Sequence, residues 1–129
     1  MMEQHVDPPL LLQDTRILVA EDEILIALDL EAALREAGAD VAGPYATLAA
    51  ALNGAEDDQL SAAVLDVRLG RDTTQTLAAR LCGRGVPFLF YSGQLLPASM
   101  RASHPHAVLL PKPIGHTVLI DAMARLIRG

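Results

Sequence analysis

Short apolar runs alternate along the chain with longer stretches in which apolar residues recur at helical spacing. The short runs predict buried strands at 16–20, 40–43, 60–66, 86–91 and 107–110. A helical pattern follows each strand, although the fourth, within 94–105, contains prolines and serines that predict a short or frayed helix. Alternating strands and helices predict an α/β fold, in which right-handed crossovers build a parallel sheet with helices on both faces.

The first and third predicted helices each give a further expectation. The first helix has a second apolar line made of Leu25, Leu28 and Ala32. That line either packs against a neighbouring helix or forms a surface for a partner protein. The third helix is expected to begin at Asp72 or Thr73, and its apolar spacing predicts that Cys82 is a small residue of the core.

Residues 1–14 precede the first strand and show no periodicity. They include Asp7-Pro8-Pro9 and are expected to form a flexible N-terminal extension, so that the folded domain spans 15–129. The alternative is that the Leu10-Leu11-Leu12 run docks on the body of the domain.

The composition supports a single domain of this class. Of the 129 residues 51% are hydrophobic but only 3% are aromatic, so the core must consist of Ala, Leu, Val and Ile. The net charge of −6 argues against a nucleic-acid surface and favours cations or proteins as partners. A single cysteine, no run of membrane-spanning length and no basic N-terminal start indicate a cytoplasmic protein that contacts no membrane.

Polar residues stand at the carboxyl ends of four predicted strands. Glu21 and Asp22 follow the first strand, Asp66 the third, Ser92 the fourth and Lys112 the fifth. Because the carboxyl ends of parallel strands share one edge of the sheet, we expect these side chains to converge there. Crowded acids repel one another unless a cation lies among them, and hard oxygen ligands suit Mg²⁺.

The same residues predict phosphoryl chemistry. Lys112 supplies a compact positive charge that can pair with a carboxylate and later with a phosphoryl oxygen, and Ser92 supplies a hydroxyl. A metal ion, a lysine and a hydroxyl around a carboxylate form a site for a phosphoryl group on that carboxylate. No cysteine or histidine clusters nearby in the sequence, which argues against zinc.

Four motifs, Ile-Leu-Val-Ala-Glu-Asp-Glu, Ala-Val-Leu-Asp-Val-Arg-Leu, Phe-Tyr-Ser-Gly and Leu-Pro-Lys-Pro, resemble those of response regulator receiver domains. The resemblance covers residues 16–128 and implies a flavodoxin-like, doubly wound five-stranded sheet in the order 2-1-3-4-5. It implies that Asp66 accepts a phosphoryl group from a sensor histidine kinase or phosphotransfer protein. Ser92 would contact that group, and Lys112 would balance its charge.

The resemblance also implies a Mg²⁺ site. Asp22, Asp66 and the backbone carbonyl of Arg68 would ligate the ion, while Glu21 would act mainly through bound water. The Arg68 side chain has two open interpretations: it pairs with the phosphoryl group and shields it from water, or it is solvated.

One departure from the receiver pattern concerns switching. Many receivers carry Tyr or Phe three residues before the lysine, where this chain has Leu109. A switch that moves an aromatic ring at that position cannot operate here. Tyr91, next to Ser92, is either a substitute for that aromatic or ordinary strand packing.

We expect no output domain after the last helix, and we therefore expect output through a downstream protein or a role as a phosphate relay or sink. The Phe-Tyr-Ser-Gly motif is similar to stand-alone receivers that work with atypical alphaproteobacterial kinases. A monomer or weak homodimer is expected.

One alternative function is that of a Mg²⁺-dependent phosphatase with Asp66 as nucleophile, although Arg68 stands where such enzymes carry a second Asp. The other is a docking module that has lost phosphorylation.

Overall fold

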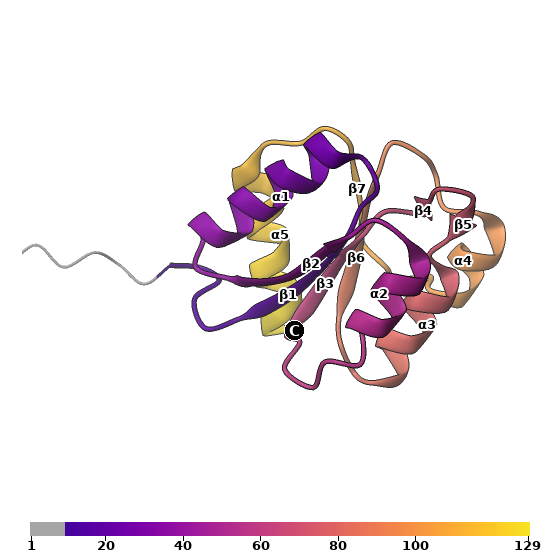
Figure 1. Cartoon of the computed structure of the whole chain (residues 1–129), viewed down its shortest axis with the longest axis horizontal. Helices are drawn as coiled ribbons and strands as arrows, with labels where there is room; N and C mark the ends of the chain where they lie inside the picture. Colours follow the sequence, from indigo (N-terminus) through magenta and orange to yellow (C-terminus); the bar gives the residue numbers. More distant parts are fainter. Residues whose placement is uncertain (1–9) are drawn as a thin grey trace, which may run out of the picture.

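A five-stranded parallel sheet in the order β2-β1-β3-β6-β7 forms the centre of the computed structural model, which describes residues 10–129 (Figure 1). Its strands are β1 (Arg16–Ala20), β2 (Asp40–Tyr45), β3 (Ala62–Leu65), β6 (Phe88–Ser92) and β7 (Leu109–Pro111). Two short strands, β4 (Arg68–Leu69) and β5 (Asp72–Thr73), form a separate antiparallel pair. Numbered within the main sheet alone, the strand order is the predicted 2-1-3-4-5, so the doubly wound fold is confirmed.

Helices cover both faces of the sheet (Figure 1). They are α1 (Ile24–Glu36), α2 (Leu48–Gly54), α3 (Gln75–Gly83), α4 (Ala98–Ser103) and α5 (His116–Arg128). Apolar residues of α1 and α5 pack on one face, and those of α2, α3 and α4 on the other. The prediction of a short fourth helix is confirmed, because α4 has only six residues. None of the helices described in 10–129 is long and apolar enough to cross a membrane.

Strand β1 shows how sequence alternation builds the two halves of the core. Ile17 and Val19 point into the cluster under α1 and α5, whereas Leu18 and Ala20 point into the opposite cluster. All four are buried because β1 lies inside the sheet, between β2 and β3. A central strand of this kind holds the residue that follows it at the sheet edge in a fixed position.

The segment before β1 is packed rather than free where the structure describes it. Leu12 has no exposed surface and belongs to the core cluster under α1. Its backbone N–H donates to the carbonyl of Ala37 at 2.9 Å, and the Thr15 hydroxyl donates to its carbonyl at 2.6 Å. Of the Leu10-Leu11-Leu12 run, Leu12 therefore docks on the body of the domain. The packed region begins before residue 15. The rest of the expected extension, residues 1–9, lies outside the described residues.

Truncation of Leu12 tests this packing. The Leu12→Ala variant is expected to lose about 3 kcal/mol of unfolding free energy, because it removes a fully buried side chain and leaves a cavity. Leu11, which is 59% exposed, is the matched control, and Leu11→Ala should change stability by less than about 0.5 kcal/mol. Urea denaturation of the full chain measures both values. Equal, small effects would show that residue 12 contributes nothing to the core.

Two expectations for α3 were wrong. Asp72 and Thr73 do not begin the helix but form β5, and α3 starts at Gln75. The Thr74 hydroxyl, at the N-cap position, donates to two backbone carbonyls of the preceding loop and makes no cap hydrogen bond. Cys82 is exposed rather than buried, because it lies roughly 90° around the helix from the centre of the inward stripe.

The second apolar line of α1 is not covered by another described helix. Leu25 is 79% exposed, Leu28 is 54% exposed, and Ala32 is also exposed. Packing against a neighbouring helix is therefore excluded within the described part of the chain. The alternative, a surface for a partner, stays a prediction.

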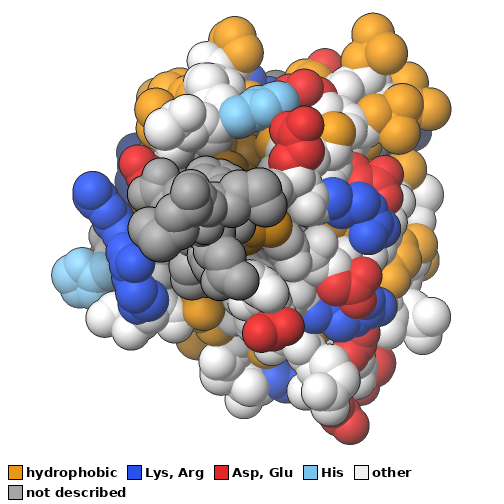
Figure 2. Space-filling view, turned by 90° about the vertical axis from the view of Figure 1, so that its left-hand side faces the viewer, with side chains coloured by type: hydrophobic (Ala, Val, Ile, Leu, Met, Phe, Trp, Pro, Cys, Tyr) orange, Lys and Arg blue, Asp and Glu red, His pale blue; other side chains and the backbone are white. Residues whose placement is uncertain are grey.

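Charged residues at the amino ends of the strands form mixed ion pairs. Arg16 pairs with Asp40 and, at 2.6 Å, with Asp57, and these contacts raise the pKa of Arg16. The hydrogen bond from Arg16 in turn lowers the pKa of Asp57. Figure 2 shows acidic and basic side chains side by side on this face of the molecule. Exposed pairs of this kind contribute little each to stability.

Candidate functional site

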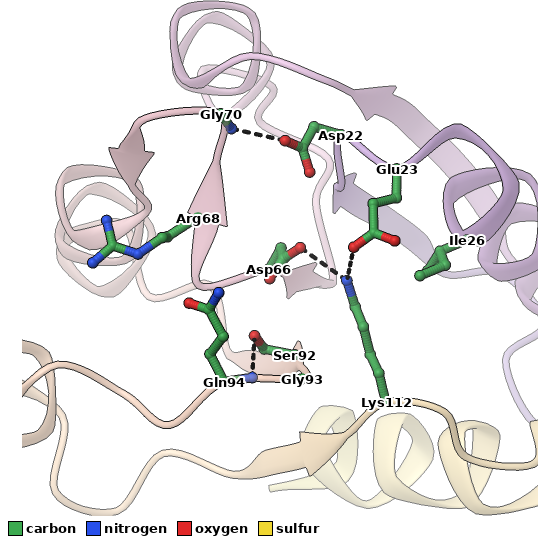
Figure 3. Close-up of a pocket in the computed structure, with 10 residues that line it drawn as sticks. All are labelled: Asp22, Glu23, Ile26, Asp66, Arg68, Gly70, Ser92, Gly93, Gln94 and Lys112. Carbon is green, nitrogen blue, oxygen red and sulfur yellow. Dashed lines mark hydrogen bonds and ion pairs between the residues drawn. The ribbon is translucent and has the colours of Figure 1, made fainter.

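A cavity of about 550 Å³ opens at the carboxyl edge of the sheet (Figure 3). Its lining includes Asp22 from the end of β1, Asp66 from the end of β3, Ser92 from β6 and Lys112 from the end of β7. The predicted convergence of strand ends therefore holds in three dimensions. Buried Glu21 reaches the same place through its contact with Lys112.

Lys112 lies at the centre of the charged groups. Its Nζ donates a hydrogen bond to Asp66 Oδ2 at 2.9 Å and lies 2.5 Å from Glu21 Oε1. Glu23 is a more distant partner at 3.6 Å, with a side chain that is 64% exposed. The Lys112 side chain is only 10% exposed, so these charges interact in a partly desolvated space where attraction is strong.

Burial and charge set the ionisation of the three groups. Burial raises the pKa of Glu21 to about 7 despite the nearby ammonium, and the Asp66 carboxyl adds to the rise. Burial acts in the same direction on Asp66, but hydrogen bonds from Lys112 and with Glu21 outweigh it and lower its pKa. The pKa of Lys112 is raised, because its two carboxylate partners outweigh its burial. Asp66 is thus an ionised carboxylate at neutral pH, which a nucleophilic oxygen must be.

Asp66 is held by the backbone around it. Its N–H donates to the carbonyl of Ala20 on β1 at 2.9 Å, and the N–H of Val67 donates to its Oδ1 at 2.7 Å. Oδ2 is the oxygen that faces Lys112. The hydroxyl of Thr74, which is fully buried, donates to the Asp66 carbonyl at 2.6 Å. These bonds fix both the direction of the carboxylate and the path of the loop after β3.

Sequence reasoning assigned no role to several residues around the site, among them Glu23, which lines the cavity, and two residues of the loop after β3. Thr74 is one of these two, and Gly70 is the other: its N–H donates to Asp22 Oδ2 at 2.8 Å. Gly70 has φ +62°, in the left-handed region, and turns the chain between β4 and β5. The Leu69-Gly70 pair signals a turn in the sequence, but nothing in the sequence signals that the turn reaches Asp22.

The Ser92 side chain points toward Asp66, whereas the Arg68 side chain points away from it (Figure 3). Ser92 is buried, and its hydroxyl points toward Asp66 while accepting a hydrogen bond from the N–H of Gln94 at 3.1 Å (Figure 3). The carbonyl of Ser92 also accepts from the Lys112 N–H at 3.1 Å, which ties the two residues together. The exposed Arg68 side chain points away from Asp66 (Figure 3), so an ion pair between Arg68 and Asp66 is not present.

The donor set fits a hard divalent cation. Carboxylate oxygens of Glu21, Asp22 and Asp66 lie within 4.8 Å of one another. Glu21 Oε1 is buried and makes no aligned hydrogen bond, although it is close to the ammonium. Oxygen ligands beside an open, polar cavity are what Mg²⁺ uses when it binds with a phosphate. The backbone carbonyl of Arg68 as a further ligand stays a prediction.

Comparison with solved structures identifies the fold. A response regulator receiver protein from Sinorhizobium medicae is 26% identical with a TM-score of 0.77, over 89% of this chain and 95% of its own. The chain has a response regulator receiver fold. The receiver domain of a sensor histidine kinase from Pseudomonas aeruginosa is also 26% identical, with a TM-score of 0.73 over 89% of this chain and 98% of its own. That structure holds a magnesium ion coordinated in its active-site cleft.

A further solved structure bears on the expected similarity to stand-alone receivers of alphaproteobacteria. The receiver domain of the PhyR response regulator from Erythrobacter litoralis is 22% identical, with a TM-score of 0.71 over 90% of this chain and 92% of its own. At that identity the match shows the fold alone. No protein-family model and no curated protein matches the sequence.

Proposed function

We propose that this receiver domain accepts a phosphoryl group on Asp66 in a Mg²⁺-dependent reaction and passes the signal on through protein contacts. The observation that carries the proposal is the joint placement of Asp66 Oδ2, the Lys112 ammonium and the Ser92 hydroxyl at one cavity. The acceptor oxygen, a cation and a hydroxyl donor are the groups that phosphoryl transfer to a carboxylate requires.

The chain's own residues supply most of the chemistry. An oxygen of the ionised Asp66 carboxylate attacks phosphorus, and the bond from phosphorus to the donor breaks as the P–O bond forms. A phosphohistidine donor leaves as imidazole and takes up a proton from solvent. Lys112 and Ser92 then stabilise the oxygens of the acyl phosphate. A magnesium ion held by Asp22, Asp66 and the backbone of Arg68, with Glu21 nearby, would neutralise the charge that gathers around the transferring group.

The proposed partners follow from this chemistry. The donor is a sensor histidine kinase or a phosphotransfer protein that presents a phosphohistidine to the cavity. The receiver domain then signals to a downstream protein or passes the phosphoryl group on as a relay. It is not proposed to turn over a substrate, because the residue two positions after Asp66 is Arg68, whose side chain points away from Asp66 (Figure 3).

Labelling with a small phosphodonor tests the proposal. The full chain is incubated with MgCl₂ and acetyl phosphate, and its intact mass is followed by mass spectrometry. We expect a gain of one phosphoryl group, loss of the gain on treatment with hydroxylamine, and no gain in EDTA. Release of phosphate over many turnovers without a stable adduct would favour a phosphatase instead. Absence of any label with either acetyl phosphate or phosphoramidate would favour a docking module.

A further inference from the structure

We propose that Tyr91 is a positioning residue that holds the Lys112 ammonium in place beside Asp66. The proposal rests on the proposed function of Asp66 and adds a residue outside the predicted site. Tyr91 lies on β6 immediately before Ser92, but successive residues of a strand face opposite sides of the sheet. Tyr91 therefore faces the α1 and α5 side of the sheet, where it belongs to the core cluster and is only 6% exposed.

The Tyr91 side chain makes two contacts with the segment that carries Lys112. Its hydroxyl accepts a hydrogen bond from the N–H of Ile114, two residues after Lys112, at 3.3 Å. Its ring centroid lies 5.8 Å from the Lys112 Nζ, within the distance at which a cation is attracted to an aromatic face. One side chain thus holds both the backbone that follows Lys112 and the charged end of Lys112.

The ring contact differs in kind from the other contacts of the ammonium. Glu21, Glu23 and Asp66 all attract Lys112 through negative charge. That attraction changes when a cation or a phosphoryl group enters the cavity, because those groups alter the charge of the carboxylates. The attraction to the Tyr91 ring does not depend on the charge of any carboxylate. It can keep a flexible four-carbon side chain aimed at the cavity while the carboxylates change state.

The chain offers a clean probe of this contact, because Lys112 is its only lysine. Protein grown with ¹³C-labelled lysine gives a single set of lysine NMR signals. A ring beneath the ammonium shifts the ε-methylene protons upfield through its ring current. We expect this shift in the wild type and in Tyr91→Phe, and its loss in Tyr91→Leu.

Kinetics provide the second measurement. Tyr91→Leu should slow phosphorylation by acetyl phosphate roughly five- to tenfold, the equivalent of one partly buried cation–π contact. Tyr91→Phe, which loses only the hydroxyl bond to Ile114, should slow it about twofold. The Mg²⁺ dissociation constant should stay within about twofold of wild type in both variants, because the ring does not face the acidic oxygens.

A matched core variant separates positioning from general destabilisation. Leu89 lies on the same strand and the same face as Tyr91 and is fully buried. Leu89→Ala should leave the lysine signal and the phosphorylation rate near wild-type values. The proposal is overturned if Tyr91→Leu keeps the upfield lysine shift, or if Leu89→Ala slows phosphorylation as much as Tyr91→Leu. If the wild type takes up no phosphoryl group, the proposed function fails, and the lysine signal alone decides whether Tyr91 positions Lys112.

Discussion

The Lys112→Met variant is expected to lose about 3 kcal/mol of unfolding free energy, because it leaves buried carboxylates without their cation. Methionine keeps a flexible apolar stem of similar length, so the loss reports mainly on the ammonium. Glu21 and Asp66 have side chains that are 1% and 10% exposed, and water cannot replace the ammonium well at either. Urea denaturation of the full chain in EDTA measures the change.

Two further variants show that charge causes the loss. The double variant Lys112→Met with Asp66→Asn should recover much of the lost stability, because the carboxylate left without a partner has been removed as well. Glu23→Gln removes the distant, exposed partner and should change stability by less than about 0.5 kcal/mol. If the double variant were as unstable as the sum of its two single variants, Lys112 and Asp66 would not be coupled, and the geometry described for the site would be wrong.

The second large effect is expected at Asp22. Asp22→Asn should weaken Mg²⁺ binding by roughly tenfold to a hundredfold. Loss of a residue that only hydrogen-bonds to a metal ligand already weakens metal binding by about this much. Asparagine keeps an oxygen that can accept the hydrogen bond from the Gly70 N–H, so the turn should stay in place. The variant therefore removes a negative charge and leaves the local fold intact. Isothermal titration calorimetry with MgCl₂ measures the affinity.

Glu36→Gln is the matched control for net charge. Glu36 is an exposed acid at the last position of α1, and the variant lowers the negative charge of the protein by the same amount as Asp22→Asn. Its Mg²⁺ affinity should equal that of the wild type. A wild-type affinity in Asp22→Asn would mean that the acidic cluster is not the magnesium site.

The five strands of the main sheet and the residues at their ends could be predicted, because they follow from local sequence, whereas the short strands β4 and β5 were not predicted. A buried parallel strand is a short apolar run, and the residue after it must lie at the carboxyl edge. Asp66 and Lys112 were placed correctly for this reason, although they are 46 positions apart and in direct contact. The helix expected after the last strand is also present, as α5 from His116 to Arg128.

The features that sequence reasoning missed depend on contacts between distant segments. Gly70 meets Asp22 across 48 positions, and no local pattern signals that contact. Thr74 is polar and precedes a helix, which is typical of a cap, yet its hydroxyl donates to the carbonyl of Asp66. Leu12 lies in a segment without periodicity, so the sequence left its docking as an alternative, and the tertiary structure shows that Leu12 occupies a core position.

The central claim is that Asp66 carries the phosphoryl group, and chemical trapping tests it most directly. Sodium borohydride reduces an aspartyl phosphate to homoserine, which peptide mass spectrometry locates by residue. After incubation with acetyl phosphate and MgCl₂, we expect homoserine at position 66 of the wild type, and none after the same treatment in EDTA. Homoserine at another aspartate, or a stable phosphoryl adduct that persists in Asp66→Asn, would contradict the account.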